Sequence, residues 1–351
     1  MQVKVCVFGH FGDGENLLNG QTVKTKIITE ELQRRFGQEQ VLKIDTRGGW
    51  KALLKAPRQT VLALRNSQNV LLFPAQNGLR VYAPLLSFFR RFFKGRKLHY
   101  VVIGGWLPQF LSQRKHLAKV LRRFDAIYVE TNTMKAALEA QGFHNVLVMP
   151  NCKKLTVLAE EDLVYPDSSP LRLCTFSRVM REKGIEDAVN AVMAVNKELG
   201  YPAFSLDIYG QVDANQIEWF QNLQKTFPDY ISYGGLIPFD KSVVTLKNYF
   251  ALLFPTYYEG EGFAGTLIDA YSAGIPVVAS DWKYNPELVN ENVGVIYPTG
   301  NEAALIEALK SIAADPETML KKKKLCLKEA EKYKIEETVK VLFRQIKSDK
   351  I

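Results

Sequence analysis

The chain has 351 residues, of which 47% are hydrophobic and 24% are charged. This length favours two domains, and this balance is typical of folded, well-cored proteins and excludes a disordered chain. The formal net charge is +9, but residues 1–165 hold 25 Lys and Arg against 12 Asp and Glu, whereas residues 166–351 hold 21 against 25. Residues 46–124 contain 16 basic residues and no acidic one. We therefore expect the first half to meet an anionic partner.

Several kinds of segment and site are not indicated by the sequence. The amino terminus alternates like a strand and lacks the apolar core of a signal peptide. No apolar run approaches the ~18 residues of a membrane-spanning helix. The four cysteines lie far apart with no Cys-x-x-Cys pair, and the four histidines are scattered. We expect a reduced, cytoplasmic protein with neither a disulfide framework nor a zinc or histidine-based metal site.

The first half alternates short apolar strands with helical patterns. Strands are expected at 3–9, 41–45, 69–74, 98–105, 126–130 and 146–151. A glycine-bearing loop, "HFGDGENLLNGQ", follows the first strand, and a helix with apolar residues at helical spacing begins near Gly20. Because each parallel strand needs a crossover connection, this rhythm predicts a doubly wound parallel sheet.

The second half restarts the same rhythm after a polar stretch rich in Pro and Ser, 160–170, which we expect to link the domains. Its strands are expected at 171–179, 204–210, 230–237, 249–255, 275–281 and 293–298, followed by amphipathic helices. The predicted fold is α/β, with two Rossmann-like doubly wound domains, 1–165 and 166–351, facing a cleft. The final helix is able to pack back on the first domain. Residues 321–324, four consecutive lysines, are expected on a solvated helix face.

The segment "EGEGFAGTLID" sets Glu261 and Asp269 eight positions apart with glycines between them. Gly262 and Gly265 let backbone approach a ligand closely, and N–H groups at the start of the following helix suit phosphate or sugar oxygens. Asp269, one turn inside that helix, is able to accept hydrogen bonds from both hydroxyls of a ribose. The alternative is an exposed acid and an Asp that favours the helix dipole.

The longer stretch "FPTYYEGEGFAGTLIDAYSAGIPVVASDWKYNPELV" resembles the nucleotide-sugar signature of retaining GT-B glycosyltransferases, those similar to glycosyltransferase family 4. That family carries two acids separated by seven residues, then a small-residue turn, a Pro-containing strand and a Pro-Glu. Here the pair is Glu261 with Asp269, where the family usually has Glu. The resemblance covers residues 171–340 and, more weakly, the first half. It implies that Glu261 holds the donor sugar, that Asp269 holds the ribose, and that the turn Gly262, Phe263, Ala264 and Gly265 binds the donor.

A second match is "FSRVMREKGIEDAV", which is similar to the family's Arg-then-Lys-Gly element. The resemblance implies that Arg178 and Lys183 neutralise the departing diphosphate. The alternative is two solvated bases in a loop. Segments "YGQV" and "GGLIP" fall where the family contacts the diphosphate and the base, which adds Gly210 and Ile237 to the donor-binding residues.

In the first half, "GDGENLLNGQT" corresponds in place to the family's N-terminal glycine-rich loop. This correspondence adds Gly20 to the predicted donor-binding residues. The glycines of this loop form no G-x-G-x-x-G, which argues against a nicotinamide-dependent dehydrogenase. Many family members carry a His after the fourth strand that touches the reacting sugar. Here "VVIGGWLPQF" offers Gly104, Gly105 and Trp106 instead, and "VETNT" (129–133) is a candidate for polar contacts.

Two segments interleave apolar and basic side chains, "LLSFFRRFFKGRK" (85–97) and "FLSQRKHLAKVLRRF" (110–124). Helices of this type bind anionic membrane surfaces, and each base near the surface contributes ~1 kcal/mol. The first domain is therefore expected to face the membrane and the acceptor. The alternatives are a core-facing Phe stripe with a solvated basic back, or nucleic acid, for which no module is recognisable.

The sequence thus predicts a retaining, hexosyltransferase-type glycosyltransferase with catalytic residues Glu261, Arg178 and Lys183. It would move a sugar from a nucleoside-diphosphate sugar, UDP being favoured, to a membrane-proximal, lipid-linked saccharide in polysaccharide biosynthesis. We expect it in the cytoplasm, peripheral on the inner face of the membrane. No Asp-x-Asp occurs in the chain, so we expect activity without a metal or other cofactor. The alternatives are a two-domain nucleotide-sugar epimerase and a catalytically idle nucleotide-sugar-binding subunit.

Overall fold

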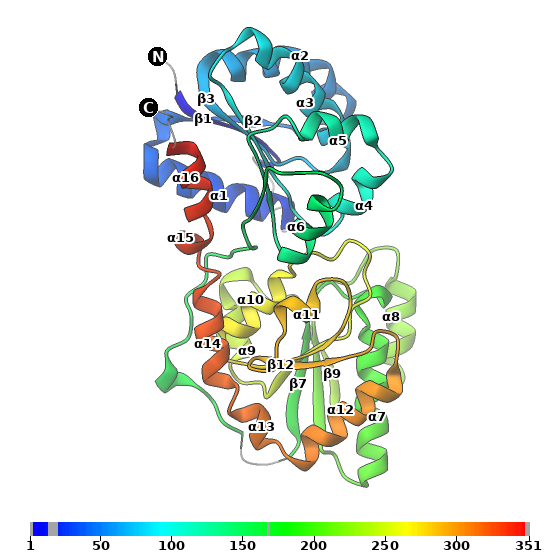
Figure 1. Ribbon diagram of the computed structural model, residues 1–351. Helices are drawn as coiled ribbons and strands as arrows, with labels where there is room; N and C mark the ends of the chain where they lie inside the picture. Colours follow the sequence, from blue (N-terminus) through cyan, green and yellow to red (C-terminus); the bar gives the residue numbers. More distant parts are fainter. Residues whose placement is uncertain (1–2, 13–19, 167–168, 348–351) are drawn as a thin grey trace. The chain divides into compact units, whose positions relative to one another are not determined.

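The computed structural model describes residues 3–12, 20–166 and 169–347. The chain divides into two compact units (Figure 1). Unit 1 consists of Met1–Lys154 and Lys334–Ile351, and unit 2 of Leu155–Tyr333.

Unit 1 is built on a six-stranded sheet in the order β2-β1-β3-β4-β5-β6, in which all neighbouring strands are parallel. Its strands are β1 (Val3–Gly9), β2 (Val41–Asp45), β3 (Ser67–Leu72), β4 (Lys97–Val101), β5 (Ala126–Val129) and β6 (Val146–Val148). The chain adds β2 on one side of β1 and then β3 on the other. The loops after β1 and β3 therefore diverge, and ligands of doubly wound sheets bind at such a reversal of strand order.

Helices cover both faces of this sheet (Figure 1). They are α1 (Gly20–Phe36), α2 (Gly49–Asn66), α3 (Gln76–Phe89), α4 (Leu107–Ser112), α5 (Lys115–Leu121), α6 (Asn132–Glu139), α15 (Ile335–Thr338) and α16 (Lys340–Lys347), with 3-10 turns at Gln38–Gln40 and Arg90–Phe92. α1 and α16 share one core with the sheet, in which Ile28 and Leu342 pack with Val5 and Leu71. α2 and α3 lie together on the other side.

Unit 2 repeats this plan with a second six-stranded parallel sheet, in the order β12-β11-β10-β7-β8-β9. Its strands are β7 (Leu171–Phe176), β8 (Phe204–Tyr209), β9 (Ile231–Gly235), β10 (Ala251–Phe254), β11 (Val277–Ser280) and β12 (Gly294–Tyr297). Here the strand order reverses between β7 and β10. The loops that follow these two strands carry both of the motifs singled out in the sequence.

The helices of unit 2 pack in two layers, each with its own hydrophobic cluster against the sheet. They are α7 (Ile185–Leu199), α8 (Ile217–Gln224), α9 (Ser242–Leu246), α10 (Gly265–Ser272), α11 (Asn285–Leu288), α12 (Glu302–Ala314), α13 (Glu317–Leu320) and α14 (Lys323–Glu331), with 3-10 turns at Glu160–Asp162, Arg181–Lys183 and Phe239–Lys241. One cluster joins the sheet to α7 and α12, and the other joins it to α9, α10 and α14. The prediction of doubly wound parallel sheets is confirmed in both units.

The chain crosses between the units at 154/155 and 333/334, whereas the sequence placed the boundary at 165/166. The predicted linker, 160–170, is polar in composition, but the chain already belongs to unit 2 before it, because apolar residues just upstream pack on that unit. Leu155 and Leu158 pack against the α9–α10–α14 cluster, and the Leu158 amide donates to the Ser272 carbonyl at 2.8 Å. The helices after residue 334 belong to unit 1.

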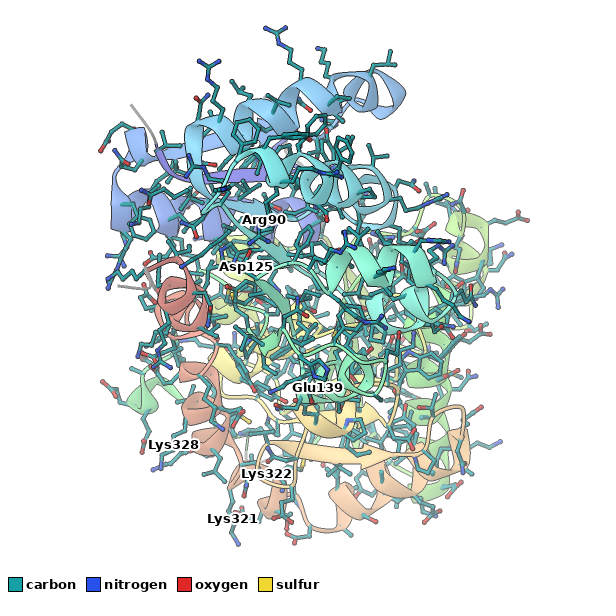
Figure 2. The ribbon with its side chains drawn as sticks, turned by 45° about the horizontal axis from the view of Figure 1, so that its top comes forward. Arg90, Asp125, Glu139, Lys321, Lys322 and Lys328 are labelled. Carbon is teal, nitrogen blue, oxygen red and sulfur yellow. The ribbon has the colours of Figure 1, made fainter. Side chains whose placement is uncertain are left out.

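The prediction of a solvated face at residues 321–324 is wrong for Lys323, whose side chain is fully buried. Lys323 shares one face of α14 with Cys326, Leu327 and Ala330, which are also buried, because these positions recur at helical spacing. Its ammonium donates to the Tyr249 carbonyl at 3.1 Å, and burial lowers its pKa to about 8. Lys321 and Lys328, by contrast, are exposed and project from the ribbon in Figure 2.

The two basic, apolar segments behave differently. The apolar side chains of 110–124 are buried in unit 1, among them Phe110, Leu117 and Phe124, so for this segment the prediction of insertion into a membrane is wrong and the core-facing alternative holds. In 85–97, by contrast, Phe88 and Phe92 are 48% and 66% exposed. None of the helices in the described part of the chain is both long and apolar enough to cross a membrane.

Candidate functional site

The site of unit 2 is built from the loops after β7 and β10, at the reversal of strand order. Gly184, which follows the β7 loop, has a φ of +68°, and a Cβ there would lie 2.1 Å from the Pro255 carbonyl oxygen. Only glycine therefore lets this turn pack against the end of β10. The side chain of Lys183, one residue earlier, is thereby directed toward the β10 loop.

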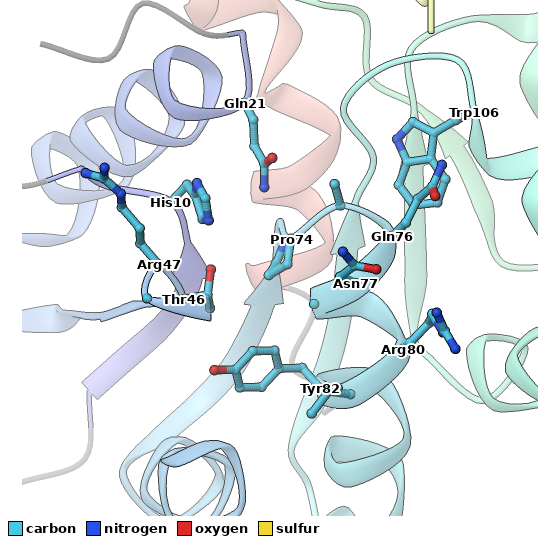
Figure 3. Close-up of a pocket in the computed structure, with 14 residues that line it drawn as sticks. His10, Gln21, Thr46, Arg47, Pro74, Gln76, Asn77, Arg80, Tyr82 and Trp106 are labelled. Carbon is cyan, nitrogen blue, oxygen red and sulfur yellow. The ribbon is translucent and has the colours of Figure 1, made fainter. Parts of the chain in front are cut away.

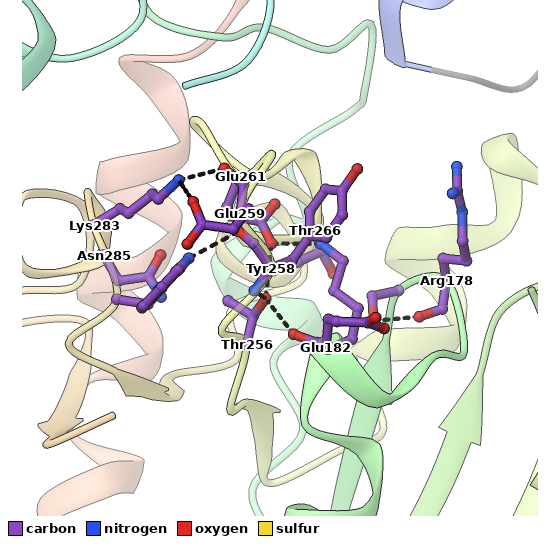
Figure 4. Close-up of polar contacts among 12 residues, drawn as sticks. Arg178, Glu182, Thr256, Tyr258, Glu259, Glu261, Thr266, Lys283 and Asn285 are labelled. Atoms are coloured by element: carbon purple, nitrogen blue, oxygen red, sulfur yellow. Dashed lines mark hydrogen bonds and ion pairs between the residues drawn. The ribbon is translucent and has the colours of Figure 1, made fainter. Parts of the chain in front are cut away.

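Glu261 receives the Lys183 side chain. The Lys183 ammonium lies 2.5 Å from Glu261 Oε2, and the Thr256 hydroxyl donates to the same oxygen at 2.9 Å (Figure 4). The ammonium also lies 5.0 Å from the centre of the Tyr258 ring. Both charged side chains retain some exposure, 12% for Lys183 and 9% for Glu261. This arrangement holds a Lys and a Glu together at the carboxyl ends of β7 and β10, the two central strands of the sheet.

Helix α10 begins at Gly265, shortly after Glu261 in the sequence. Ala264 precedes the helix in extended conformation, no side chain caps it, and no acid occupies the first turn. The first N–H groups of an α-helix have no partner within the helix and favour anions. The Thr266 hydroxyl donates to the Phe176 carbonyl at the end of β7, which fixes the helix start against the strand that precedes Arg178 and Lys183.

Arg178 is not brought to Glu261. Its guanidinium lies 3.5 Å from the Asp213 carboxylate and is 55% exposed, and Figure 4 shows it apart from Glu261. Gly210, after β8, has a φ of +138°, and a Cβ there would lie 1.8 Å from the Ser177 carbonyl oxygen. Glycine is required at that position for the β7 and β8 loops to meet.

Asp269 is 1% exposed on α10, and its carboxylate accepts a hydrogen bond from the Ser242 hydroxyl of α9 at 2.9 Å. The structure therefore gives this acid a contact within the protein, and its contact with a ribose stays a prediction. Phe263 is also buried, with its ring edge-on to Tyr333 at 4.7 Å between centroids. Only the backbone of Phe263 is left to meet a donor.

The other predicted donor-binding residues are spread over both units. Gly262 is buried, whereas Ala264 and Gly265 are partly exposed at the start of α10. Ile237 follows β9 and is partly exposed. Gly20 is the exposed first residue of α1 in unit 1.

Sequence reasoning missed Thr256 and Ser242. Thr256 has a signal in hindsight, since it stands just after a buried strand and five residues before Glu261. Ser242 has none, because it belongs to a different helix and meets Asp269 only through packing. The third acid of the segment, Glu259, is 72% exposed and pairs with Lys283 at 2.7 Å, so it forms a surface ion pair.

Unit 1 has a cavity of about 1190 Å³ at its own reversal of strand order (Figure 3). It is lined by His10, Gln21, Thr46, Arg47, Gly48, Pro74, Ala75, Gln76, Asn77, Gly78, Arg80, Val81, Tyr82 and Trp106. Trp106 belongs to the stretch that offers Gly104, Gly105 and Trp106 where the resembling family often has a His. Two of the "VETNT" candidates have contacts within the fold, since Glu130 pairs with Lys24 and the Thr131 hydroxyl caps α6.

Comparisons with known proteins agree with this fold. Residues 170–315, which lie within unit 2, match the family described as Glycosyl transferases group 1. Among solved structures, the crystal structure of Anabaena Alr3699/HepE in complex with UDP and glucose superposes with a TM-score of 0.73 over 99% of this chain and 100% of that one, at 14% identity. The predicted GT-B fold is thereby confirmed.

Four curated relatives match in sequence, and two of them illustrate the range. The chain is 27% identical over 164 residues to the UDP-N-acetylglucosamine--peptide N-acetylglucosaminyltransferase GtfA subunit of Streptococcus gordonii, covering 46% of this chain and 31% of the relative. It is 28% identical over 145 residues to the amylovoran biosynthesis glycosyltransferase AmsK of Erwinia amylovora, covering 40% of this chain and 35% of the relative. The chain thus spans about a third of the length of these relatives.

Proposed function

Because residues 170–315 match the Glycosyl transferases group 1 family, we propose that this protein is a retaining glycosyltransferase that uses a nucleoside-diphosphate sugar. The observation that carries the proposal is the Lys183–Glu261–Thr256 cluster at the reversal of strand order, next in sequence to the uncapped start of α10. An incoming diphosphate offers Lys183 a second anion, and the helix start offers further N–H donors.

In the proposed reaction, the bond between the anomeric carbon of the sugar and the diphosphate oxygen breaks. A bond from the anomeric carbon to an acceptor hydroxyl oxygen forms on the same face. The proton of that hydroxyl passes to the departing phosphate oxygen. Lys183 and Arg178 stabilise the negative charge that develops on the leaving group, and Glu261 holds the sugar hydroxyls. No step requires a divalent metal, and activity that vanishes in chelator and returns with Mn²⁺ would contradict this.

UDP is the favoured nucleotide, since the name of the GtfA relatives specifies UDP-N-acetylglucosamine and the HepE structure holds UDP with glucose. A thermal-shift screen against UDP, GDP, ADP and TDP tests this, because a ligand that binds the folded state raises the melting temperature. We expect UDP to give the largest shift, and Lys183→Met to reduce it. No shift with any of the four would count against nucleotide binding.

Experiments must distinguish glycosyl transfer from two other functions, epimerisation of the donor and nucleotide binding without catalysis. A nucleotide-sugar epimerase would isomerise the donor with no acceptor present, which chromatography of the sugar after incubation with donor alone would detect. A catalytically idle subunit would bind the nucleotide but transfer nothing. Arg178→Ala is the discriminating variant: we expect slower transfer, and an unchanged transfer rate would favour another role.

We also propose that unit 1 docks on an anionic membrane to reach a lipid-linked saccharide acceptor in polysaccharide assembly. Its exposed aromatic residues support this: Phe88 and Phe92 stand beside Arg91, whose guanidinium lies 3.9 Å from the centre of the Phe88 ring. Such an apolar and cationic pairing suits a headgroup boundary. The test is co-sedimentation with anionic and neutral liposomes. The double variant Phe88→Ser/Phe92→Ser should lose most binding, and equal binding to both lipids would remove the electrostatic part of the proposal.

A further inference from the structure

Lys183 belongs to a short turn that depends on outside contacts for its position. The turn is the 3-10 segment Arg181–Lys183, between the β7 loop and α7. Hydrogen bonds in a 3-10 turn are less well aligned than those in an α-helix, and all three residues of this turn are exposed or only partly buried. The contacts that hold the turn from outside therefore set how far the Lys183 ammonium reaches toward Glu261.

Gln216, at the end of the β8 loop, contacts this turn with both ends of its side-chain amide. Its Oε1 accepts a hydrogen bond from the Arg181 backbone N–H at 2.8 Å, and its Nε2 donates to the Glu182 carboxylate at 2.9 Å. These partners fix the orientation of the amide, because a backbone N–H donates and a carboxylate accepts. One side chain thus restrains two consecutive residues of the turn, and a shift of the turn breaks at least one of these bonds.

The start of α8 fixes Gln216 and adds a second, weaker contact to the turn. Gln216 stands directly before α8, and its backbone N–H donates to the Asp213 carbonyl at 2.9 Å. Trp219 donates through Nε1 to the Glu186 carboxylate at 3.0 Å, and the centre of its six-membered or five-membered ring system lies 4.9 Å from the Arg181 guanidinium. Arg181 also pairs with Glu186 at 3.2 Å, but both side chains are exposed, and exposed ion pairs contribute little. The Gln216 amide is therefore the main restraint on this side of the turn.

Glu182 connects Gln216 to the loop that carries Glu261. The Glu182 carbonyl accepts a hydrogen bond from the Tyr257 backbone N–H at 2.8 Å. The Thr256 hydroxyl lies 3.3 Å from that carbonyl oxygen and 2.9 Å from Glu261 Oε2 (Figure 4). The contacts therefore run from Gln216 through Glu182 to the loop that holds Glu261, so the spacing between the turn and that loop depends on Gln216.

We infer that Gln216 is a positioning residue for Lys183: it holds the turn so that the Lys183 ammonium reaches the donor diphosphate. This inference rests on the proposed function and adds to it a residue outside the motifs singled out in the sequence. A misplacement of about 1 Å in an active site can cost about 10²-fold in rate, so the position of this cation matters as much as its charge. Because Gln216 acts through Lys183, its removal should matter only while Lys183 is present.

Calorimetry with UDP tests this in a double-mutant cycle of four proteins: the parent, Gln216→Ala, Lys183→Met and the double variant. We expect Lys183→Met to weaken UDP binding about tenfold, because a charge-assisted hydrogen bond is lost, and Gln216→Ala to weaken it about fivefold. Adding Gln216→Ala to Lys183→Met should change the affinity by less than about twofold. A loss by the same factor in both backgrounds would show that Gln216 acts independently of Lys183 and would overturn the inference, as would parent-like binding by Gln216→Ala.

An exchange of side chains tests the contact itself. Gln216→Glu sets a second carboxylate against Glu182, and we expect it to weaken UDP binding at least as much as Gln216→Ala does. Adding Glu182→Gln places an amide opposite a carboxylate again, so the double variant Gln216→Glu/Glu182→Gln should recover most of the loss. No recovery would overturn the inference. Gln221→Ala, at an exposed glutamine of α8, is the matched control and should bind UDP like the parent protein.

The parent protein and Lys183→Met separate failure of this inference from failure of the proposed function. A parent protein that binds no UDP would overturn the proposed donor and the inference with it. If Lys183→Met bound UDP like the parent protein, the role of Lys183 on which both depend would be overturned. The inference alone fails where Lys183→Met weakens binding and Gln216→Ala does not, or where the exchange of side chains gives no recovery.

Discussion

Each unit holds a Lys–Glu pair in which the acid follows a strand of its parallel sheet, yet the two pairs differ in exposure. In unit 1, Lys24 of α1 lies 2.6 Å from Glu130, and the two side chains are 3% and 2% exposed. In unit 2, Lys183 lies 2.5 Å from Glu261, with 12% and 9% exposed. The first pair is sealed under α1 and joins the helix to the sheet. The second is less deeply buried, so burial separates a structural pair from a candidate catalytic one.

The units also differ in total charge. Unit 1 contains 30 Lys and Arg against 12 Asp and Glu, and unit 2 contains 16 against 25. A net charge of +18 attracts anionic partners over a Debye length. Unit 2, at −9, is left to bind its proposed anionic donor through local groups alone, namely Lys183 and the start of α10. Long-range attraction therefore belongs to unit 1, and short-range recognition to unit 2.

The largest effect is expected from breaking the sealed pair. Lys24→Met leaves the Glu130 carboxylate buried without the Lys24 ammonium, and such a loss costs about 3–5 kcal/mol. Hydrogen exchange read separately over the two units should show unit 1 destabilised and unit 2 unchanged. The double variant Lys24→Met/Glu130→Leu should recover much of the loss, and failure to recover would mean that the pair is not the main interaction of either residue.

The open pair should respond in activity rather than in stability. Glu261→Gln removes the charge that faces Lys183, and we expect transfer to fall about 10²-fold or more, with little change in melting temperature. Glu259→Gln is the matched control, because this acid is two residues away and pairs at the surface with Lys283. If both variants were equally active, the Lys183–Glu261 pair would have no catalytic role.

Acid between pH 6.5 and pH 4 should destabilise unit 1, because His99 belongs to it. His99 is buried between Asn69 and Tyr128, and burial lowers its pKa from 6.5 to about 4. Below pH 6.5 the unfolded chain takes up a proton that the folded chain refuses until about pH 4. Stability should therefore fall through this window by up to about 3 kcal/mol. Urea titrations of the parent and of His99→Gln at pH 7 and pH 4.5 measure the difference, which should shrink in the variant.

The smallest effect concerns Lys323 in unit 2, whose burial lowers its pKa from 10.5 to about 8. Stability should rise between pH 8 and pH 10.5, because only the unfolded chain keeps its proton there. Lys323→Met removes the cost of burying the ammonium at pH 7 but leaves the Tyr249 carbonyl without that donor, so we expect a gain of only about 1–2 kcal/mol. The exposed neighbour Lys324 supplies the control, Lys324→Met, and a loss of stability in Lys323→Met would show that its hydrogen bond matters more than its charge.

Much of the candidate site could be predicted from the sequence because its parts are local. The order of strands, the glycine turns and the position of Glu261 before a helix all follow from runs of ten to twenty residues. Lys183 and Glu261 were both identified, but the contact between them was not, since it joins two loops separated by 78 positions. Ser242 beside Asp269 and the arginine-lined cavity of unit 1 were missed for the same reason.

By itself, the sequence determined two doubly wound sheets, the uneven charge and the nucleotide-sugar signature, because hydrophobic periodicity and turn chemistry act over short stretches of chain. Only the tertiary structure decided which charged and which apolar side chains are buried. Lys323 and the apolar side chains of 110–124 lie in the interior, whereas Phe88 and Phe92 remain exposed. Burial depends on what packs against a residue from elsewhere in the chain, and that neighbour cannot be read from the residue's own segment.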